Sequence, residues 1–396
     1  MKQYISFILL MLAISGCEIN QKDLKPEDEF VKIYNDPDEQ LAYYPLSLVQ
    51  TNDRGFIILA AIKYDSSLSE YPTAAIIRTN ATGEVQNTVK TSWLAPVPRI
   101  TQVDGNVSFI AMDSQSKASM ISVNSTDGEI AGNTSLDLTM PLYSLTDEQN
   151  RIVVLGYNYV SRASIVALLS STGSLINRTE LNVNTDLISQ IQTHMNKTGS
   201  ELPFFIGEWQ NETESGYFVN CLANYTLRTV FFNTSLATTG GDIYSFQARD
   251  ALSSLINISG NNYAFTRYYG SQNYISSNVE VNPNSSQNFN ELTQNKLDEL
   301  VPSAKVVSRK VLFNNNEYML FASSTNSNSI VVYQYSVDNP EELLHTEYFD
   351  FENKIEISDM IQDSFDDGIV VLGKIYLTGR FQRPIVVKFK KDEFNN

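Results

Sequence analysis

Two histidines are the first side chains to consider for acid–base or metal chemistry. His194 lies in a polar connecting stretch, and His345 lies beside Leu343 and Leu344 in a run that predicts an outer β-strand. Neither belongs to an H-E-x-x-H zinc motif, and the chain has no G-x-S-x-G nucleophile elbow and no Walker-type phosphate loop. We therefore expect surface or structural roles for both histidines. The sequence predicts no catalytic residue, no cofactor and no metal site.

Carboxylates are the remaining candidates for catalysis, because glycoside hydrolases need one pair of acids about 5 to 9.5 Å apart. Asp53 and Asp366 lie in similar turns that precede a glycine. Ser364-Phe-Asp366-Asp-Gly368 matches the first half of S-x-D-x-G-x-T-W, the Asp-box of sialidases, but the tryptophan is missing. We interpret both aspartates as turn caps. A carboxylate-based carbohydrate-active enzyme stays open as the alternative function.

The first seventeen residues carry the pattern of a lipid-attachment signal. Lys2 gives a short positive start, an apolar run follows from Tyr4 to Ile14, and Ser15 and Gly16 lead into Cys17. This pattern resembles a bacterial lipoprotein signal, in which the cysteine becomes the lipidated N-terminus after cleavage. An ordinary secretory signal is the alternative, whereas a transmembrane helix needs about 20 apolar residues. We expect lipidation at Cys17, with two or more acyl chains giving stable attachment.

Residue usage in the mature chain narrows its location and its partners. Glu18 follows Cys17, where an aspartate would resemble the inner-membrane retention signal of enteric bacteria, so we expect anchoring in the outer membrane of a cell envelope. Only Cys221 then remains, which excludes an intramolecular disulfide and a Cys/His zinc cage. Its apolar surroundings predict a buried strand position. The formal charge of −17 and the pI near 4.6 argue against nucleic acid as a partner.

A unit of about 52 residues repeats along the chain. Each copy has a polar turn with Asp, Asn or Gly, an apolar strand, a loop, a second apolar strand and another turn. Glycine is expected to supply positive φ in these turns, and the apolar runs are too short for helices. The copies centre on strands expected at 56–60, 74–78, 107–112, 118–123, 152–156, 163–169, 217–223, 227–232, 263–268, 318–322, 330–335, 369–373 and 384–388.

This repeat predicts an all-β fold, a seven-bladed β-propeller, because four antiparallel strands occupy about 40 to 50 residues. A pair of β-sandwiches is the rival, but it would not repeat one turn seven times. Phe30 to Tyr34 reads as a lone outer strand, and the last copy stops after its third strand. We expect the N-terminal strand to complete the last blade and to leave no unpaired edge.

The repeats are similar to the T-x-D-G-G-[YF]-[IV] units of β-propeller lipoproteins common in Bacteroidota. The matching residues are Thr51, Asp53, Gly55 and Phe56 in the first copy and Ser364, Asp366, Gly368 and Ile369 in the last. This resemblance implies a fold and a compartment, and no activity comes with it. The expected organisation is a signal peptide at 1–16, a lipidated spacer at 17–29 and the propeller at 30–396.

Aromatic residues and insertions are the candidate binding features. Trp93, Trp209 and tyrosines such as Tyr43, Tyr44, Tyr268 and Tyr269 could stack on sugars or anchor a protein, although packing between blades is the simpler interpretation. Tyr269 to Tyr274 predicts an exposed hairpin turn. Two insertions, 181–210 and 288–305, interrupt the spacing, and the second is expected to form a short helix. The overall prediction is a lipid-anchored binding or scaffold module for a protein partner or glycan.

Overall fold

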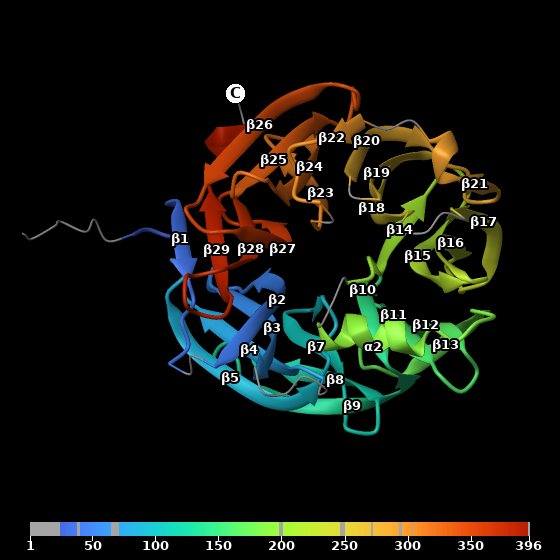
Figure 1. The fold of residues 1–396 in the computed structure, drawn as a ribbon, viewed down its shortest axis with the longest axis horizontal. Helices are drawn as coiled ribbons and strands as arrows, with labels where there is room; N and C mark the ends of the chain where they lie inside the picture. Colours follow the sequence, from blue (N-terminus) through green and yellow to red (C-terminus); the bar gives the residue numbers. More distant parts are fainter. Residues whose placement is uncertain are drawn as a thin grey trace, which may run out of the picture.

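Twenty-nine strands dominate the computed structural model, which describes residues 24–37, 40–64, 71–197, 201–245, 250–270, 272–292, 295–302 and 304–394. The strands form six hydrogen-bonded sheets arranged in a ring (Figure 1). The largest sheet contains two four-stranded groups that share only the Leu94–Met112 pair. Dividing it there gives seven groups among the described residues, which we call blades 1 to 7. Each has four antiparallel strands, and blade 4 has in addition β21 (Ser286–Asn288) as a fifth. The β-propeller fold expected from the sequence is confirmed.

Each blade runs from an innermost to an outermost strand. Blades 1 to 3 comprise β2 Leu41–Gln50, β3 Phe56–Tyr64, β4 Thr73–Thr79, β5 Val85–Leu94, β6 Ile100–Val103, β7 Asn106–Met112, β8 Lys117–Val123, β9 Ile130–Thr139, β10 Pro141–Thr146, β11 Ile152–Asn158, β12 Ala163–Leu169 and β13 Leu175–Asn182. Blades 4 and 5 comprise β14 Phe205–Gln210, β15 Ser215–Ala223, β16 Thr226–Asn233, β17 Thr238–Tyr244, β18 Asp250–Ser259, β19 Asn262–Tyr269, β20 Gln272–Glu280 and β22 Asn295–Leu297. Blades 6 and 7 comprise β23 Val307–Phe313, β24 Asn316–Ser324, β25 Ser329–Ser336, β26 Leu343–Asp350, β27 Ile355–Gln362, β28 Ile369–Ile375, β29 Arg383–Phe389 and β1 Phe30–Ile33.

The second and third strands of a blade are apolar on both faces because each face packs against a neighbouring blade. In β3, for example, every residue from Phe56 to Lys63 is buried. The core of the described residues divides into seven clusters, one at each junction between successive blades. The outermost strands contact a neighbour through one face only, so β13 is mostly exposed. This pattern explains the continuous apolar runs in the sequence.

The N-terminal strand closes the ring, as expected. β1 pairs antiparallel with β29, from Phe30 opposite Lys388 to Ile33 opposite Ile385, and Figure 1 shows the two strands side by side. The Phe30 side chain is 6% exposed and packs against Phe56 of blade 1. Blade 7 therefore joins the two ends of the described chain, and β1 covers the edge of β29 and becomes the outermost strand.

The turns differ from the expectation in one respect. Gly55 and Gly368 do not have positive φ; the residues before them, Arg54 at 68° and Asp367 at 62°, adopt the left-handed conformation. A Cβ on Gly55 would clash with the carbonyl oxygen of Thr79, and one on Gly368 with the carbonyl oxygen of Phe389. Glycine is needed at these two positions because the backbones of two strands approach closely.

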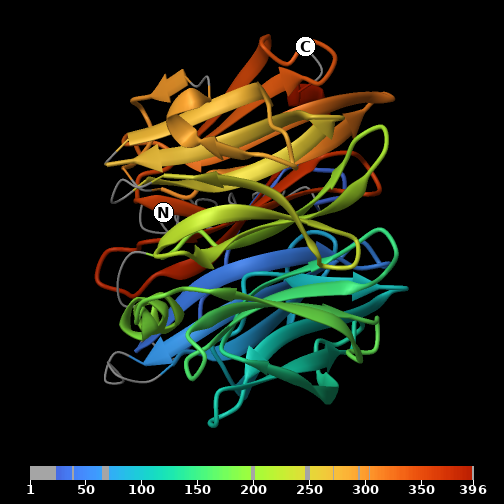
Figure 2. The ribbon, with the colours of Figure 1, turned by 90° about the vertical axis from the view of Figure 1, so that its right-hand side faces the viewer.

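The two insertions form different structures. Between β13 and β14, residues 181–210 include helix α2, Ile188–Asn196, which projects from one face of the ring in side view (Figure 2). The short helix expected within 288–305 is wrong, because this segment contains the three-residue 3₁₀ turn η1, Phe289–Glu291, and then β22. Just before it, β21 (Ser286–Asn288) pairs in parallel with β17 of blade 4. The last turn, η2, spans Lys391–Phe394. No helix of the described residues is long and apolar enough to cross a membrane.

The ring has two different faces. The N-terminal face carries the turns between the first and second strands of each blade, and the opposite face carries α2 and the connections between blades. On the N-terminal face, hydrogen bonds link every pair of neighbouring blades in turn. The linked pairs are Gln50–Gln102, Asp104–Asn150, Glu148–Glu208, Gln210–Asn257, Ile258–Lys310, Leu312–Gln362 and Ser364–Gln50.

Candidate functional site

The aspartates of the first and last repeats cap turns, as predicted. Asp53 accepts hydrogen bonds from the Thr51 hydroxyl, at 2.5 Å, and from the Gly55 amide, at 3.3 Å. Burial alone would raise the pKa of Asp53, but these hydrogen bonds and the Arg78 charge hold it below its usual range. Asp366 accepts from the Gly368 amide at 2.9 Å and binds Lys388 at 2.6 Å. Both carboxylates are therefore occupied by structural partners.

The histidines and Cys221 have the structural or surface environments expected of them. His194 is buried in α2, accepts a hydrogen bond from the Leu202 amide at 3.0 Å and packs edge-on against Phe204. Burial lowers the pKa of His194 to about 3, so its ring is neutral. His345 lies in the outer strand β26, with its Nε2 3.1 Å from Glu347. Cys221 is buried in β15, and burial raises its pKa to about 12.

The tryptophans belong to the packing between strands rather than to a binding surface. Trp209 is 2% exposed in β14, and its indole nitrogen donates to the Phe232 carbonyl at 3.0 Å. Trp93, in β5, is half-buried against the core between blades 1 and 2. Tyr43 is buried, whereas Tyr269, at the end of β19, is 42% exposed. The position of each aromatic side chain in its blade determines how exposed it is. The sequence alone could not place Trp209 on an innermost strand.

Two acids with opposite pKa shifts lie on the N-terminal face, Asp147 in blade 3 and Glu208 in blade 4. Asp147 accepts from the Tyr217 hydroxyl at 2.6 Å and from Arg151 Nε at 2.7 Å. Burial opposes ionisation, but these partners hold the pKa of Asp147 below its usual range. Burial and nearby Asp147 and Glu148 raise the pKa of Glu208 to about 7. Glu208 accepts from the Glu148 amide at 3.4 Å, and neither Asp147 nor Glu208 lines the cavity described below.

The chain enters the ring at the N-terminal face. Phe30 pairs with Lys388, and the Lys388 ammonium binds the Pro26 carbonyl at 2.7 Å together with Asp363 and Asp366 at 2.6 Å each. Asp363 and Asp366 belong to the turn between β27 and β28. The segment that leads back toward the N-terminus therefore leaves the ring on the face that carries these turns.

An exposed apolar patch lies on the opposite face. Tyr159, Val160 and Tyr225, which we call the outward patch, are 56%, 77% and 68% exposed. Tyr159 and Val160 lie between β11 and β12, and Tyr225 lies between β15 and β16. The connection after β13 joins these loops, because the Val183 amide binds the Arg162 carbonyl and the Val183 carbonyl accepts from the Tyr225 amide. Tyr225 has a φ of 74°, so the loop holds it in a conformation that costs energy for a bulky residue.

A charged cluster that the sequence analysis did not identify occupies the axial region of the ring. Asp359 of β27 is 4% exposed and accepts from the Ser47 hydroxyl of β2 at 2.9 Å. Arg309 of β23 binds the same carboxylate at 2.5 Å, and Arg99, just before β6, approaches it at 4.0 Å. Four blades thus converge on one carboxylate. Burial favours the neutral acid, but Arg309 and Arg99 hold the pKa of Asp359 below its usual range.

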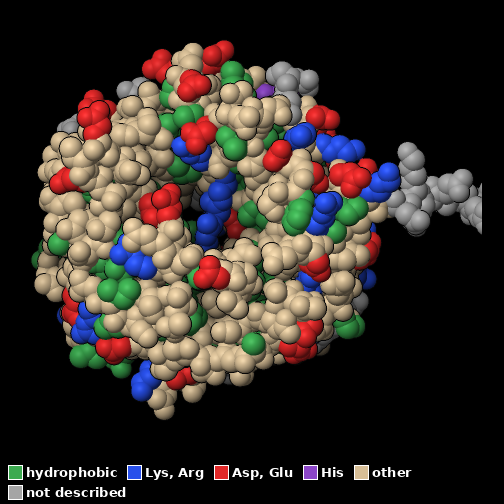
Figure 3. Space-filling view, turned by 180° about the vertical axis from the view of Figure 1, so that it is seen from behind, with side chains coloured by type: hydrophobic (Ala, Val, Ile, Leu, Met, Phe, Trp, Pro, Cys, Tyr) green, Lys and Arg blue, Asp and Glu red, His purple; other side chains and the backbone are tan. Residues whose placement is uncertain are grey.

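Positive charge exceeds negative charge in this cluster. The Lys305 ammonium donates to the Ser358 carbonyl at 2.5 Å, next to Asp359. Burial lowers the pKa of Lys305 to about 8 and, together with the neighbouring Arg99, lowers the pKa of Arg309. Three cations therefore surround one carboxylate. Figure 3 shows Lys and Arg side chains within the central opening of the ring.

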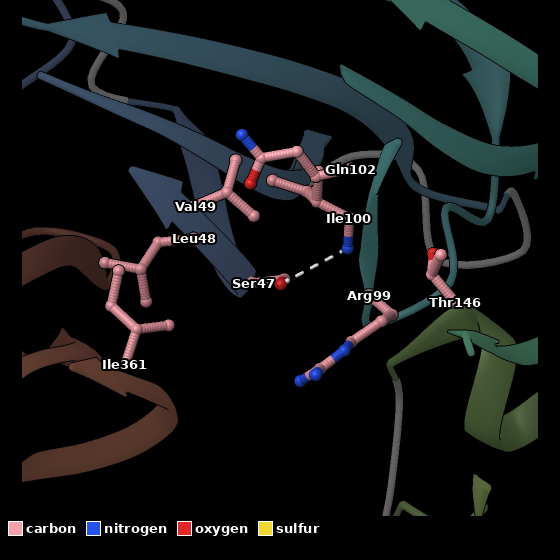
Figure 4. A pocket seen from close by; sticks show the side chains of 8 residues that line it. All are labelled: Ser47, Leu48, Val49, Arg99, Ile100, Gln102, Thr146 and Ile361. Carbon is pink, nitrogen blue, oxygen red and sulfur yellow. Dashed lines mark hydrogen bonds between the residues drawn. The ribbon is translucent and has the colours of Figure 1, made fainter. Parts of the chain in front are cut away.

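A cavity of about 210 Å³ adjoins the cluster. Arg99 and Thr146 supply polar groups to its wall, and the Arg99 side chain extends into the space that the lining residues surround (Figure 4). The other lining residues are Ser47, Leu48, Val49, Ile100, Gln102 and Ile361, from β2, β6 and β27.

Comparisons with known proteins find similarity of shape only. No protein-family model matches the sequence, and no curated protein matches it. Solved structures similar to this one include the Dos1 propeller, with 10% identity, a TM-score of 0.46, and coverage of 92% of this chain and 95% of that chain. YCF48 from Cyanidioschyzon merolae has 12% identity, a TM-score of 0.47, and coverage of 91% and 99%. Trypanosoma rangeli sialidase has 9% identity, a TM-score of 0.44, and coverage of 88% and 55%. The fold assignment rests on the strand pairing above.

Proposed function

We propose that the protein is a cell-envelope lipoprotein, anchored in the outer membrane through Cys17, that acts as a binding or scaffold module for a protein partner or a glycan. The observation that carries this proposal is the position of the outward patch, on the face opposite the entry of the N-terminal segment. The signal-like N-terminus and the Asp-Gly turns support membership among the β-propeller lipoproteins that the chain resembles.

The segment that would join the lipid at Cys17 to the ring is short. Cys17 itself lies outside the described residues, whereas residues 25–28 already contact one another and the ring through Lys25, Asp28 and Pro26. The seven Cα-to-Cα steps from Cys17 to Leu24 span at most about 25 Å when fully extended. An acyl-anchored ring would therefore lie close to the bilayer with its N-terminal face toward the lipid. The outward patch would then point away from the membrane.

The composition of the outward patch suits a protein or sugar surface. Tyrosine supplies a large rigid contact area with a polar end, and it is enriched at positions that dominate binding energy. Tyr159, Val160 and Tyr225 lie on loops that backbone hydrogen bonds hold together. A rigid patch loses little conformational entropy when a partner binds.

Affinity capture from native membranes tests this proposal. Wild-type chain is compared with a Val160→Asp, Tyr225→Ala variant, and Phe365→Ala is the matched control because Phe365 is 44% exposed on the N-terminal face. We expect one partner or glycan to be recovered with wild type and with the control, and at least tenfold less with the double variant. Equal recovery with the double variant would contradict a role for the outward patch.

The acids near blade 4 favour one second candidate, the carboxylate-based carbohydrate-active enzyme. Glu208, with a pKa of about 7, could donate a proton while Asp147 stays ionised, which is the division of roles that glycoside hydrolysis needs. Turnover of a glycan panel by wild type, lost in Glu208→Gln and retained in the Val160→Asp, Tyr225→Ala variant, would establish this alternative. No turnover would leave the binding function as the proposal.

A further inference from the structure

The axial region holds more positive than negative charge close to Asp359. Arg99, Lys305 and Arg309 carry three positive charges around Asp359, so the cluster has a net charge of +2 in a chain whose formal charge is −17. Other charges nearer the opposite face are paired: Lys197 binds Glu201 at 2.6 Å and Lys374 binds Glu356 at 2.8 Å. Glu201 also acts on Lys305, so Arg99 is the cation of this cluster that lacks a close anionic partner among the described residues.

Asp359 has little capacity left to neutralise these cations. Its two oxygens accept from the Ser47 hydroxyl, the Leu48 amide, the Met360 amide and Arg309. Arg309 Nε donates a hydrogen bond to the Met360 carbonyl, and Arg309 Nη1 donates one to the Ser308 carbonyl, at 2.9 Å each. Asp359 and Arg309 therefore use their hydrogen-bonding groups to connect blades 1, 6 and 7.

Arg99 is different, because its guanidinium has no hydrogen bond to any described residue. Its one ionic approach is the 4.0 Å separation from Asp359, which is too long for a hydrogen bond. The side chain is 29% exposed, and it projects into the cavity (Figure 4). Five N–H donors of a permanently charged group thus face an open space.

A second polar group on the cavity wall also lacks a partner. The Thr146 hydroxyl is shielded from bulk solvent and has no hydrogen-bond partner among the described residues. Buried hydroxyls are normally paired, because an unpaired one has lost its hydrogen bonds to water without replacement. Thr146 and Arg99 line the same cavity from different blades. The cavity wall therefore carries two polar groups that no described residue satisfies.

We propose that this cavity binds a small organic carboxylate, with Arg99 as the anion-binding residue. A guanidinium matches the two oxygens of a carboxylate in a bidentate arrangement. Leu48, Val49, Ile100 and Ile361 form apolar walls beside Arg99, which suits a short hydrocarbon body attached to the carboxylate. The volume of about 210 Å³ lies below the range of about 300–1,000 Å³ typical of sites for drug-sized ligands. The occupant is therefore a small acid, and this site is separate from the outward patch.

Calorimetric titration of the full chain in detergent, in chloride-free buffer of low ionic strength, tests the assignment. The probes are acetate, butyrate, benzoate and inorganic phosphate. We expect saturable binding of one carboxylate per chain, with butyrate tighter than acetate because the apolar walls contact its chain. Absence of saturable binding for all three carboxylates, or binding of phosphate alone, would overturn the proposal.

Three variants separate the site from general attraction between charges. Arg99→Gln removes the charge and should weaken carboxylate binding about tenfold or more. Val49→Phe keeps every charge but fills the cavity, and it should also abolish binding. Arg178→Gln, on the exposed strand β13, is the matched control and should bind as wild type does. Thermal unfolding checks that each variant is folded, and undiminished binding by folded Arg99→Gln or folded Val49→Phe would contradict the assignment.

Discussion

Arg78 binds Asp53 across the first turn of the propeller, so the end of the third strand of blade 1 fixes the turn that precedes its second strand. The Arg78 side chain is fully buried, and its Nε also donates to the Ser125 carbonyl of blade 2 at 2.8 Å. Lys388 repeats this relationship with Asp366 in blade 7. The basic residue one position before the end of the third strand is thus the partner of the turn aspartate in both repeats.

Arg78→Leu tests the structural value of this contact. Its removal leaves the Ser125 carbonyl without its donor and the Asp53 carboxylate without its charge partner, so we expect the free energy of unfolding to fall by about 1–3 kcal/mol. Arg178→Leu, whose ion pairs are exposed, should cost less than about 1 kcal/mol. Chemical denaturation measures both. An equal decrease in the free energy of unfolding for both variants would show that the buried contact of Arg78 stabilises the fold no more than an exposed ion pair does.

Two substitutions in β1 test whether this strand holds the ring closed. Phe30→Ala removes a buried ring from the junction between blades 7 and 1 and should cost about 3–5 kcal/mol. Val31, its neighbour in β1, is 40% exposed, so Val31→Ala should cost less than about 1 kcal/mol. Thermal unfolding of both variants checks the difference. If Phe30→Ala is no worse than Val31→Ala, β1 does not hold the ring closed.

The pH dependence of stability should report on the contact between Glu393 of η2 and Glu29, which precedes β1. Burial and the neighbouring Glu29 raise the pKa of Glu393 from 4.5 to about 7. The folded state therefore binds this proton more tightly than the unfolded state, and the resulting stabilisation is complete below about pH 4.5 and is lost as the pH rises through 7. We expect Glu393→Gln to flatten the decline in stability between pH 5 and pH 8. An unchanged pH profile would rule out Glu393 as its source.

Lipid attachment is tested at Cys17. Cys17→Ser should abolish incorporation of a labelled fatty acid and should move the chain from the membrane fraction to the soluble fraction. Cys221→Ser is the control, because Cys221 is buried in β15 and should not affect labelling. Mass spectrometry of the N-terminal peptide identifies the attached group. Full labelling of Cys17→Ser would exclude Cys17 as the acceptor.

The local features of the fold could be predicted from the sequence. Strands such as Ala163–Leu169 are short apolar runs bounded by polar turns, so their ends follow from neighbouring residues. Closure by Phe30–Ile33 was predictable because the last repeat lacks one strand. The role of Gly55 was not, because the carbonyl that requires it, that of Thr79, belongs to a different strand.

The axial site could not be predicted in the same way. Arg99, Lys305, Arg309 and Asp359 come from three blades and are separated by up to 260 positions in the chain. Only the ring geometry brings them together, and none lies in a motif. Trp209 was ambiguous for a related reason, since its burial depends on Phe231 and other residues packed across two blades.

The orientation of the ring can be measured by site-specific photo-crosslinking in native membranes, with a photoreactive phenylalanine analogue in place of Tyr225 or of Phe365. These positions are both exposed and lie on opposite faces. We predict a discrete crosslinked partner from position 225 and none from position 365. A partner crosslinked from position 365 but not from position 225 would contradict recognition through the face opposite the anchor.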